Sequence, residues 1–307
     1  MNDSTVAAAL GERFLTLFPS APQTADVRAA VAKAAAAAGD LDTALARYRA
    51  SVDAGRTERT DALGVELADR AIRKLESLPP EAEDRGDKVA ALAVTAGELV
   101  APIAGDAAVA DDLRAEALNL LGWSAFYGGR FDDAATAYRT VVEELSETPS
   151  YEEALTQLGV TLARTDDAGA AEIALRTAWR QLQPDEPAPA GAAVQGRLQD
   201  AWIAGLERAR FLQSRGDRAA DAGEAYRELY EKFPNSRTGA LLWEWGRTLY
   251  HAGQTDSSLY AEADAVFAEL VQRAPDYPEA DLALFLLAEG DLLADPSRPS
   301  EAARRFR

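Results

Sequence analysis

The sequence predicts an all-α protein built as a solenoid of antiparallel helix pairs. Three observations predict it: a pattern of small and aromatic residues that returns along the chain, heavy use of alanine with only 7% aromatic residues, and no segment with the pattern of a strand. A solenoid of 307 residues can form one continuous body, because each unit packs only on its neighbours. We expect a right-handed superhelix of roughly twelve to fourteen helices.

The clearest repeat unit begins near Ala115. Its first helix carries Leu118, Leu121, Gly122 and Ala125, and its second helix carries Phe131, Ala134 and Tyr138. Because Gly122 and Ala134 are small, the two helices can approach closely, and Leu121 and Tyr138 fill the space on either side. Gly129 permits the tight turn between the two antiparallel helices.

The same arrangement returns twice in full and three times in part. The full returns are Leu155, Leu158, Gly159 and Leu162 with Ala171, Leu175 and Pro184, and Leu242, Trp245, Gly246 and Leu249 with Gly253, Tyr260, Ala263, Phe267 and Pro275. The partial returns are Gly39, Leu41, Ala44 and Tyr48, then Gly216, Ala222, Tyr226 and Pro234, and finally Ala302 with Phe306. The terminal proline stops the second helix of a unit and starts the next unit.

These residues resemble the tetratricopeptide repeat (TPR) family, and the resemblance covers most of the chain. A plain helical bundle is the alternative, because alanine-rich helices produce single matches by chance. The runs that join the units, such as Phe18-Pro19-Ser20 and Phe233-Pro234-Asn235, resemble those of bacterial envelope adaptors of the outer-membrane-assembly and Tol–Pal accessory type. This resemblance implies a periplasmic location, although the same subtype occurs in cytoplasmic bacterial proteins.

We expect a single solenoid over residues 1–307. Its predicted units are 1–22 (partial), 23–56, 57–114 (degenerate), 115–151, 152–198, 199–238, 239–277 and 278–307 (truncated). The degenerate unit is expected to form two long helices, Glu58 to Leu78 and Asp87 to Ile103, without the small-residue signature. Pro184 to Ala193 and Gly253 to Tyr260 are expected to form loops. Because the last predicted helix has room for one turn only, we expect the chain to be a fragment of a longer one, with a natural frayed end as the alternative.

The composition is acidic, with a formal net charge of -19 and only four lysines among 32 basic residues. Such a chain repels nucleic acid phosphates and anionic lipid surfaces. An arginine-rich, lysine-poor chain fits a GC-rich genome, and an acidic surface also suits a high-salt organism. There is no cysteine, which excludes disulfides and cysteine metal sites. No stretch has the pattern of a transmembrane helix, and the start of the chain does not resemble a signal peptide.

No catalytic constellation is recognisable, and we expect no enzyme activity, cofactor or metal site. The single histidine, His251, fits a surface or groove position. The pairs Asp132-Asp133 and Asp166-Asp167 lie at expected turns or helix starts, where carboxylates cap exposed amides. Neighbouring residues on a helix point apart, so these pairs are poor acid–base or metal sites.

The resemblance to the TPR family implies that the first helices line a concave groove that binds peptides. The residues that it places in this groove are Asn119, Trp123, Phe126, Tyr127, Arg164, Arg210, Gln213, Trp243, Arg247, Tyr250 and His251. Aromatic residues and arginine dominate binding hot spots. The alternative is that the large aromatics only fill gaps between units, and that acidic neighbours such as Glu207 and Glu244 neutralise the arginines.

The function that follows is a scaffold that binds a protein or peptide, with an acidic or mixed acidic–aromatic segment as the expected ligand of the arginines. Two alternatives remain open. The repeats could be the accessory arm of a larger enzyme or signalling protein, or they could form a self-assembling rod.

The charge generates the first testable prediction, which is that the chain does not bind nucleic acid strongly. Electrophoretic mobility shift titrations with duplex DNA and with single-stranded RNA should give no complex below about 1 μM protein at physiological salt, since phosphates are repelled. A salt-sensitive complex at lower concentrations would contradict this expectation.

Overall fold

The computed structural model describes residues 3–21, 23–53, 55–188, 196–234, 238–293, 299, 300 and 303. Within these ranges the chain forms fourteen α-helices and no strand, so the predicted all-α architecture is confirmed. The chain divides into two compact units, residues 1–165 and residues 166–307. The division falls inside the predicted repeat at 152–198.

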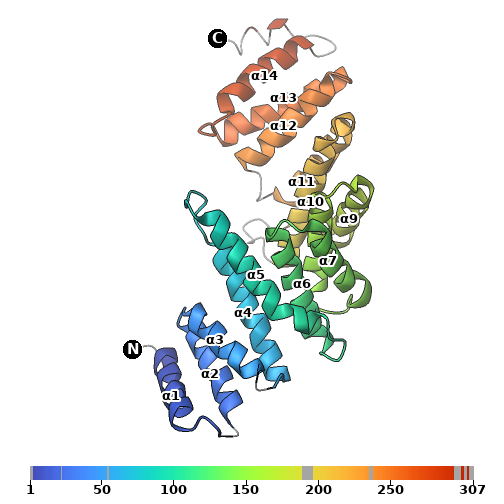
Figure 1. Ribbon diagram of the computed structural model, residues 1–307. Coiled ribbons are helices and arrows are strands. Elements are labelled where there is room, and N and C mark those ends of the chain that lie inside the picture. Colours follow the sequence, from blue (N-terminus) through green and yellow to red (C-terminus); the bar gives the residue numbers. More distant parts are fainter. Residues whose placement is uncertain are drawn as a thin grey trace. The chain divides into compact units, whose positions relative to one another are not determined.

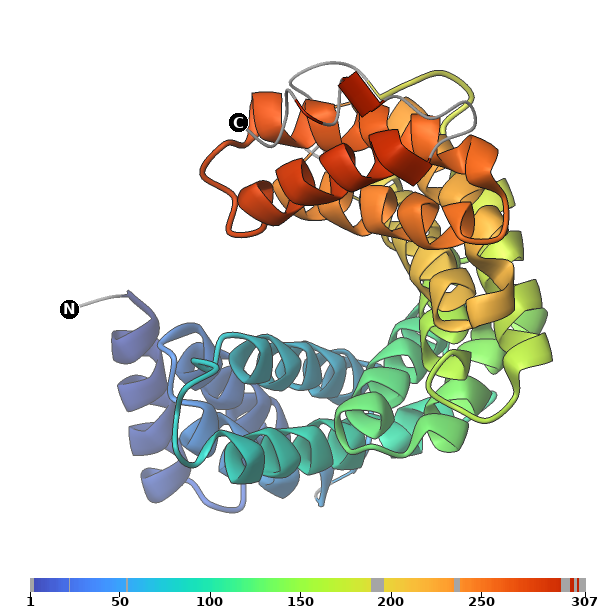
Figure 2. The ribbon, with the colours of Figure 1, turned by 90° about the horizontal axis from the view of Figure 1, so that it is seen from above.

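The described residues of the first unit form eight helices, and each helix packs against the next (Figure 1). They are α1 (Asp3–Leu17), α2 (Thr24–Ala37), α3 (Leu41–Val52), α4 (Glu58–Glu76), α5 (Arg85–Ala104), α6 (Asp111–Tyr127), α7 (Phe131–Glu144) and α8 (Tyr151–Leu162). Figure 2 shows consecutive helices side by side, joined by short turns. The helices α2, α4, α6 and α8 also contact one another in series. Their shared exposed side is called the first-helix face below.

Between residues 166 and 293, the described part of the second unit forms six α-helices, again with each one packed against the next. They are α9 (Ala168–Leu182), α10 (Arg197–Ser214), α11 (Ala219–Lys232), α12 (Gly239–Gly253), α13 (Tyr260–Arg273) and α14 (Ala280–Leu293), with 3-10 turns at Gly216–Arg218 and Ser257–Leu259. One hydrophobic cluster runs from Trp179 on α9 to Leu287 on α14 and includes the fully buried rings of Tyr226 and Phe267.

The crossing of α6 and α7 has the close contact that the sequence predicts. A Cβ placed on Gly122 would lie 2.5 Å from the ring of Tyr138, and Tyr138 and Ala134 are both fully buried. The same contact recurs between α12 and α13, where a Cβ on Gly246 would lie 2.6 Å from the ring of Phe267. The turn before α7 depends on Gly129, whose φ of 72° lies in the left-handed region that favours glycine.

The segment expected to be degenerate forms its two long helices, α4 and α5, close to the predicted bounds. A small residue does lie at a helix crossing there, but its aromatic partner comes from the preceding helix. A Cβ on Gly64 would lie 2.5 Å from the hydroxyl oxygen of Tyr48 on α3.

Polar side chains fix the helix starts as expected. Asp167 caps α9, because its carboxylate accepts a hydrogen bond from the backbone N–H of Ala170 at 2.9 Å. Asp132 and Asp133 lie in the first turn of α7, where negative charge is favourable. Thr57 and Thr60 form a reciprocal capping box at the start of α4.

The two predicted loops are seen only in part. Residues 184–188 form no helix, and residues 189–193 lie outside the described ranges. Between Gly253 and Tyr260 the chain forms a turn and a short 3-10 helix. Of the predicted helix at the end of the chain, Pro299, Ser300 and Ala303 are described and are helical, whereas Ala302 and Phe306 lie outside the described ranges.

The α6–α7 crossing generates the second prediction. Ala134→Phe should lower the free energy of unfolding by about 1–3 kcal/mol, because a large side chain has no space where the two helices touch. Gly122→Ala should lower it in the same direction, since its new methyl group meets the buried ring of Tyr138. Urea unfolding followed by circular dichroism measures both changes.

Gly86→Ala is the matched control for these variants. Gly86 lies in the first turn of α5, and no atom lies within 4 Å of a Cβ placed there. This change should leave stability within about 0.5 kcal/mol or raise it slightly. An unchanged midpoint for Ala134→Phe would show that the helix register is wrong.

Candidate functional site

The exposed side of α4 carries a stripe of charged residues. Arg59, Glu66, Asp69, Arg73 and Glu76 recur at helical spacing, which places them on one side of the helix. The residues on the opposite side are buried in the first unit. The stripe therefore belongs to the first-helix face.

The helix α6 contributes aromatic rings to the same face. Trp123 stacks on Tyr127 with ring centroids 5.5 Å apart and an interplanar angle of 19°. Phe126 packs edge-on against both rings, at 6.0 and 5.9 Å, and its other side meets Phe131 of α7. All three rings on α6 are partly buried, so each keeps some surface open to solvent.

Carboxylates from the neighbouring helices hold the two stacked rings. The indole N–H of Trp123 donates a hydrogen bond to Oε1 of Glu153 on α8 at 2.8 Å, and the hydroxyl of Tyr127 donates to Oε1 of Glu76 on α4 at 3.0 Å. Three helices thus position one aromatic pair. Together with Asp69 and Glu116, these four residues form what we call the carboxylate–aromatic cluster.

Asn119 lies in the same stripe of α6 and is only 3% exposed. Its amide nitrogen donates to the backbone oxygen of Ser150 at 2.9 Å and approaches Oε2 of Glu153 at 3.4 Å. Its amide oxygen is buried and accepts no hydrogen bond within the described ranges. A buried acceptor without a donor is costly, typically by about 1–3 kcal/mol.

The electrostatics of the cluster are dominated by negative charge. The pKa of Glu116 is raised, first by its partial desolvation and then by the nearby charges of Asp69 and Glu153. Partial burial also raises the pKa of Tyr127, and Glu76 raises it further. Arg73 offsets part of this charge, since its guanidinium pairs with Asp69 at 2.8 Å.

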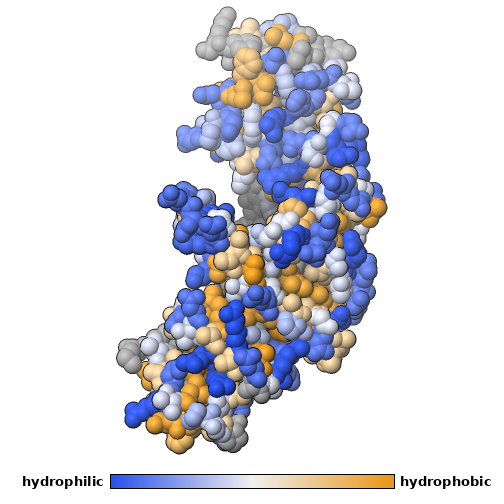
Figure 3. Space-filling view, viewed as in Figure 1, coloured by the Kyte–Doolittle hydropathy of each residue, from blue (hydrophilic) through white to orange (hydrophobic). Residues whose placement is uncertain are grey.

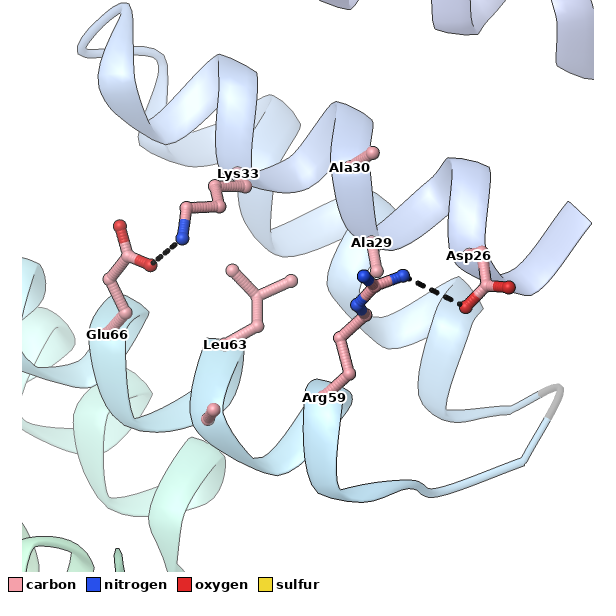
Figure 4. Close-up of a pocket in the computed structure, with 8 residues that line it drawn as sticks. Asp26, Ala29, Ala30, Lys33, Arg59, Leu63 and Glu66 are labelled. Atoms are coloured by element: carbon pink, nitrogen blue, oxygen red, sulfur yellow. Dashed lines mark hydrogen bonds and ion pairs between the residues drawn. The ribbon is translucent and has the colours of Figure 1, made fainter. Parts of the chain in front are cut away.

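A shallow hollow of about 320 Å³ lies between α2 and α4 (Figure 4). The helix α4 also carries Asp69 and Glu76 of the cluster. Two ion pairs cross the hollow, from Lys33 to Glu66 and from Arg59 to Asp26, each at 3.5 Å. Alanine side chains and Leu63 line it between these pairs. Each charge that crosses the hollow has a partner of opposite sign, so the hollow has no net preference for a charged ligand.

The first-helix face of the first unit is not an apolar groove. The large exposed hydrophobic side chains in the described part of this unit lie on α1, just after it and on α5: Val6, Leu10, Leu17, Phe18 and Val94. Figure 3 shows hydrophobic and hydrophilic side chains interspersed over one side of the unit. The first-helix face therefore offers charged groups and aromatic rings rather than an apolar groove.

In the second unit, acidic side chains form ion pairs with Arg210. Its guanidinium binds both carboxylate oxygens of Glu244, at 3.0 and 2.8 Å, and also Glu207 at 3.1 Å. The hydroxyl of Tyr226 donates to Glu244 at 3.0 Å and lies 3.2 Å from the side-chain oxygen of Gln213. The sequence left open whether acidic neighbours neutralise the charge of Arg210. In the structure, Glu244 and Glu207 do so.

The other predicted residues of the second unit lie on α12. Trp243 packs on the ring of Phe267 with centroids 5.8 Å apart, and the hydroxyl of Tyr250 donates to Glu289 at 2.5 Å. Arg247 and His251 are exposed. Arg247 forms no hydrogen bond or ion pair within the described part of the chain, although the charge of Glu244 lies near it.

The predicted groove residues thus lie in separate places. Asn119, Trp123, Phe126 and Tyr127 are neighbours on α6. Arg164 lies in the turn after α8 of the first unit, whereas Arg210 and Arg247 belong to the second unit. The sequence analysis missed Glu76, Glu116 and Glu153, although the spacing of Glu116 from Asn119 and Trp123 could have identified it.

Within the described ranges, no three histidine, aspartate or glutamate side chains gather as a metal site, and no helix is long and apolar enough to cross a membrane. The side chains of the cluster offer hydrogen bonds, charge and stacked rings.

Comparison with known proteins identifies one repeat. Residues 116–147, which cover most of α6 and all of α7, match the family model of the tetratricopeptide repeat. No curated protein matches the chain. A tetratricopeptide repeat protein from Parabacteroides merdae ATCC 43184 aligns with a TM-score of 0.45 and 13% identity, over 94% of this chain and 92% of that one. The human IFIT1 dimer with PPP-AAAA aligns with a TM-score of 0.28 and 15% identity, over 100% and 72%.

The raised pKa of Glu116 generates the third prediction. Glu116→Gln should stabilise the protein at pH 7 by about 0.2–1 kcal/mol, because it removes a carboxylate that is partly desolvated and that its neighbours repel. Because the folded-state pKa of Glu116 is raised, the folded chain keeps the proton of this carboxyl group up to a higher pH than the unfolded chain does. The stability of the wild type therefore falls as the pH rises from the ordinary pKa of 4.5 through the folded-state pKa. The gain of the variant should therefore shrink towards pH 4, as measured by urea unfolding at both pH values.

Glu143→Gln provides the control, because Glu143 is an exposed carboxylate on α7 with no partner in the described part of the chain. This variant should show no such pH-dependent gain. An equal gain in both variants would assign the effect to the net charge of the whole chain.

Proposed function

We propose that this chain is a non-catalytic scaffold that binds another protein or a peptide on its first-helix face. The observation that carries the proposal is the carboxylate–aromatic cluster, in which three helices hold the Trp123–Tyr127 pair in one orientation. Partly exposed aromatic side chains that their neighbours fix in place lose little entropy on binding, and such residues are enriched in binding hot spots. The match of residues 116–147 to the tetratricopeptide repeat supports this class of function, because that fold generally mediates protein–protein interactions.

The charge of the partner is a separate part of the proposal. The sequence-based expectation of an acidic segment depends on Arg164, Arg210 and Arg247. Since Glu244 and Glu207 already bind Arg210, an acidic ligand would have to displace two carboxylates there. Arg247, in contrast, is exposed and has no ion-pair partner within the described part of the chain, so it could take a carboxylate without displacing one.

An envelope location is a further part of the proposal. It is supported by the proline-containing runs that join the units, as in Phe18-Pro19-Ser20 and Ala274-Pro275-Asp276. In that setting the scaffold would act as an adaptor between other envelope proteins.

The test, and the fourth prediction, is affinity capture from the source cells with mass spectrometry, followed by binding titrations with the captured partner. Trp123→Leu should weaken binding by about tenfold or more, because it removes a ring typical of hot spots. Val94→Ala is the control, since Val94 is 50% exposed on α5 and lies outside the cluster. It should leave the affinity within about twofold.

Circular dichroism and the melting temperature check that Trp123→Leu keeps the fold. If a folded Trp123→Leu variant bound the partner as tightly as the wild type, the first-helix face of the first unit would not be the binding surface. If no partner were captured under any condition, the scaffold proposal itself would fail.

A further inference from the structure

We propose that the carboxylate–aromatic cluster of the first unit binds an arginine-rich, cationic segment of a partner protein. This inference rests on the proposed scaffold function and names the chemistry of the ligand. It differs from the sequence-based expectation of an acidic segment, and it concerns a surface that lies wholly on α4, α6 and α8.

The first argument is the balance of charge. The four carboxylates of the cluster, Asp69, Glu76, Glu116 and Glu153, face two guanidinium groups, those of Arg73 and Arg85. Negative charge is therefore in excess on this surface.

Arg73 pairs with Asp69, and Arg85 points its Nε towards the backbone oxygen of Leu78. Glu116 has no hydrogen bond or ion pair within the described part of the chain, and its pKa is raised first by partial desolvation and then by the nearby charges of Asp69 and Glu153. A cation that reached this carboxylate would relieve an existing repulsion.

The second argument is the flat aromatic surface beside these carboxylates. Trp123 and Tyr127 are stacked, and their polar atoms are tied to Glu153 and Glu76. A guanidinium can lie on an aromatic face and donate in its own plane to carboxylates at the edge of the ring. A lysine ammonium is a compact point charge and lacks this second mode, so arginine fits the surface better.

The third argument is independent of charge. The buried amide oxygen of Asn119 has no donor among the described residues, and its amide nitrogen is directed to Glu153 of the cluster. An N–H from a bound arginine or from a peptide backbone is the kind of group that this acceptor lacks.

The hollow between α2 and α4, on another part of the first-helix face, lacks this excess of negative charge, because the two ion pairs that cross it are balanced. The cationic segment is therefore assigned to the cluster. Adjacent helices lie about 9 Å apart, so the three helices of the cluster span roughly 18 Å, or about six extended residues.

The experiment, and the fifth prediction, uses fluorescence anisotropy of the full chain with labelled peptides of about ten residues. One peptide carries arginine and phenylalanine in a glycine–serine background, a second has every arginine replaced by lysine, and a third has every arginine replaced by glutamate. The arginine peptide should bind most tightly and the glutamate peptide should not bind. Binding should weaken as salt is raised from about 50 to 300 mM, because the attraction is screened.

The matched variants have the same change in net charge. Glu76→Gln with Glu116→Gln removes two negative charges from the cluster, and the new amide at position 76 can still accept the hydrogen bond from Tyr127. Glu143→Gln with Glu147→Gln removes two exposed charges from the end of α7 and the turn after it. The cluster variant should lose about tenfold in affinity for the arginine peptide, and the control should change by less than about twofold.

Equal losses in the two variants would mean that only general charge attraction holds the peptide, and the proposal would be overturned. Tighter binding of the glutamate peptide would overturn it as well. If no peptide binds but the captured partner still requires Trp123, the cationic assignment fails and the scaffold function stands. If neither peptide nor partner binds, both fail.

Discussion

The close approach of a small residue to an aromatic ring is the contact on which the rest of the structure depends. Gly122 against Tyr138 and Gly246 against Phe267 bring two helices together at distances that no larger residue allows. Because the ring is fully buried at each crossing, the orientation of one helix fixes the orientation of its partner. The exposed side of each first helix is decided by the same contact. In this way a packing constraint determines which side chains remain available for binding.

The carboxylate–aromatic cluster is a consequence of that constraint. Neighbouring first helices turn their polar stripes to the same side, so carboxylates of α4 and α8 reach the rings of α6. The gathering of like charges is unfavourable for the folded chain, and it adds to partial desolvation, the larger cause, in raising the pKa of Glu116. Part of that cost is offset by the hydrogen bonds that the carboxylates accept from Trp123 and Tyr127. A surface with excess negative charge beside ordered aromatic rings is suited to binding, because a ligand can supply the positive charge that the fold does not.

The candidate site was predictable from the sequence to the extent that it lies on one helix. Asn119, Trp123 and Tyr127 follow helical spacing, so their common side could be inferred. The partners of these side chains could not, because Glu76 and Glu153 lie 51 and 30 residues away from the groups that they bind. The same limit applies to Arg210. The sequence showed Glu207 nearby as a group that could neutralise its charge. Its contact with both carboxylate oxygens of Glu244 depends on the packing of α10 and α12.

The sequence by itself determined that the chain is helical, the approximate bounds of α4 and α5, and the tight turn at Gly129 and the cap at Asp167. These features follow from local periodicity, capping and backbone preference. The sequence also determined the excess of acidic residues. The tertiary structure alone decided which acidic residues gather. Which side chains meet across two helices depends on the relative rotation of those helices. Contacts such as that of Tyr48 with Gly64, which join residues from different repeat units, set this rotation. The sign of the charge at the candidate site is therefore a property of the packed helices, since no single helix carries the whole cluster.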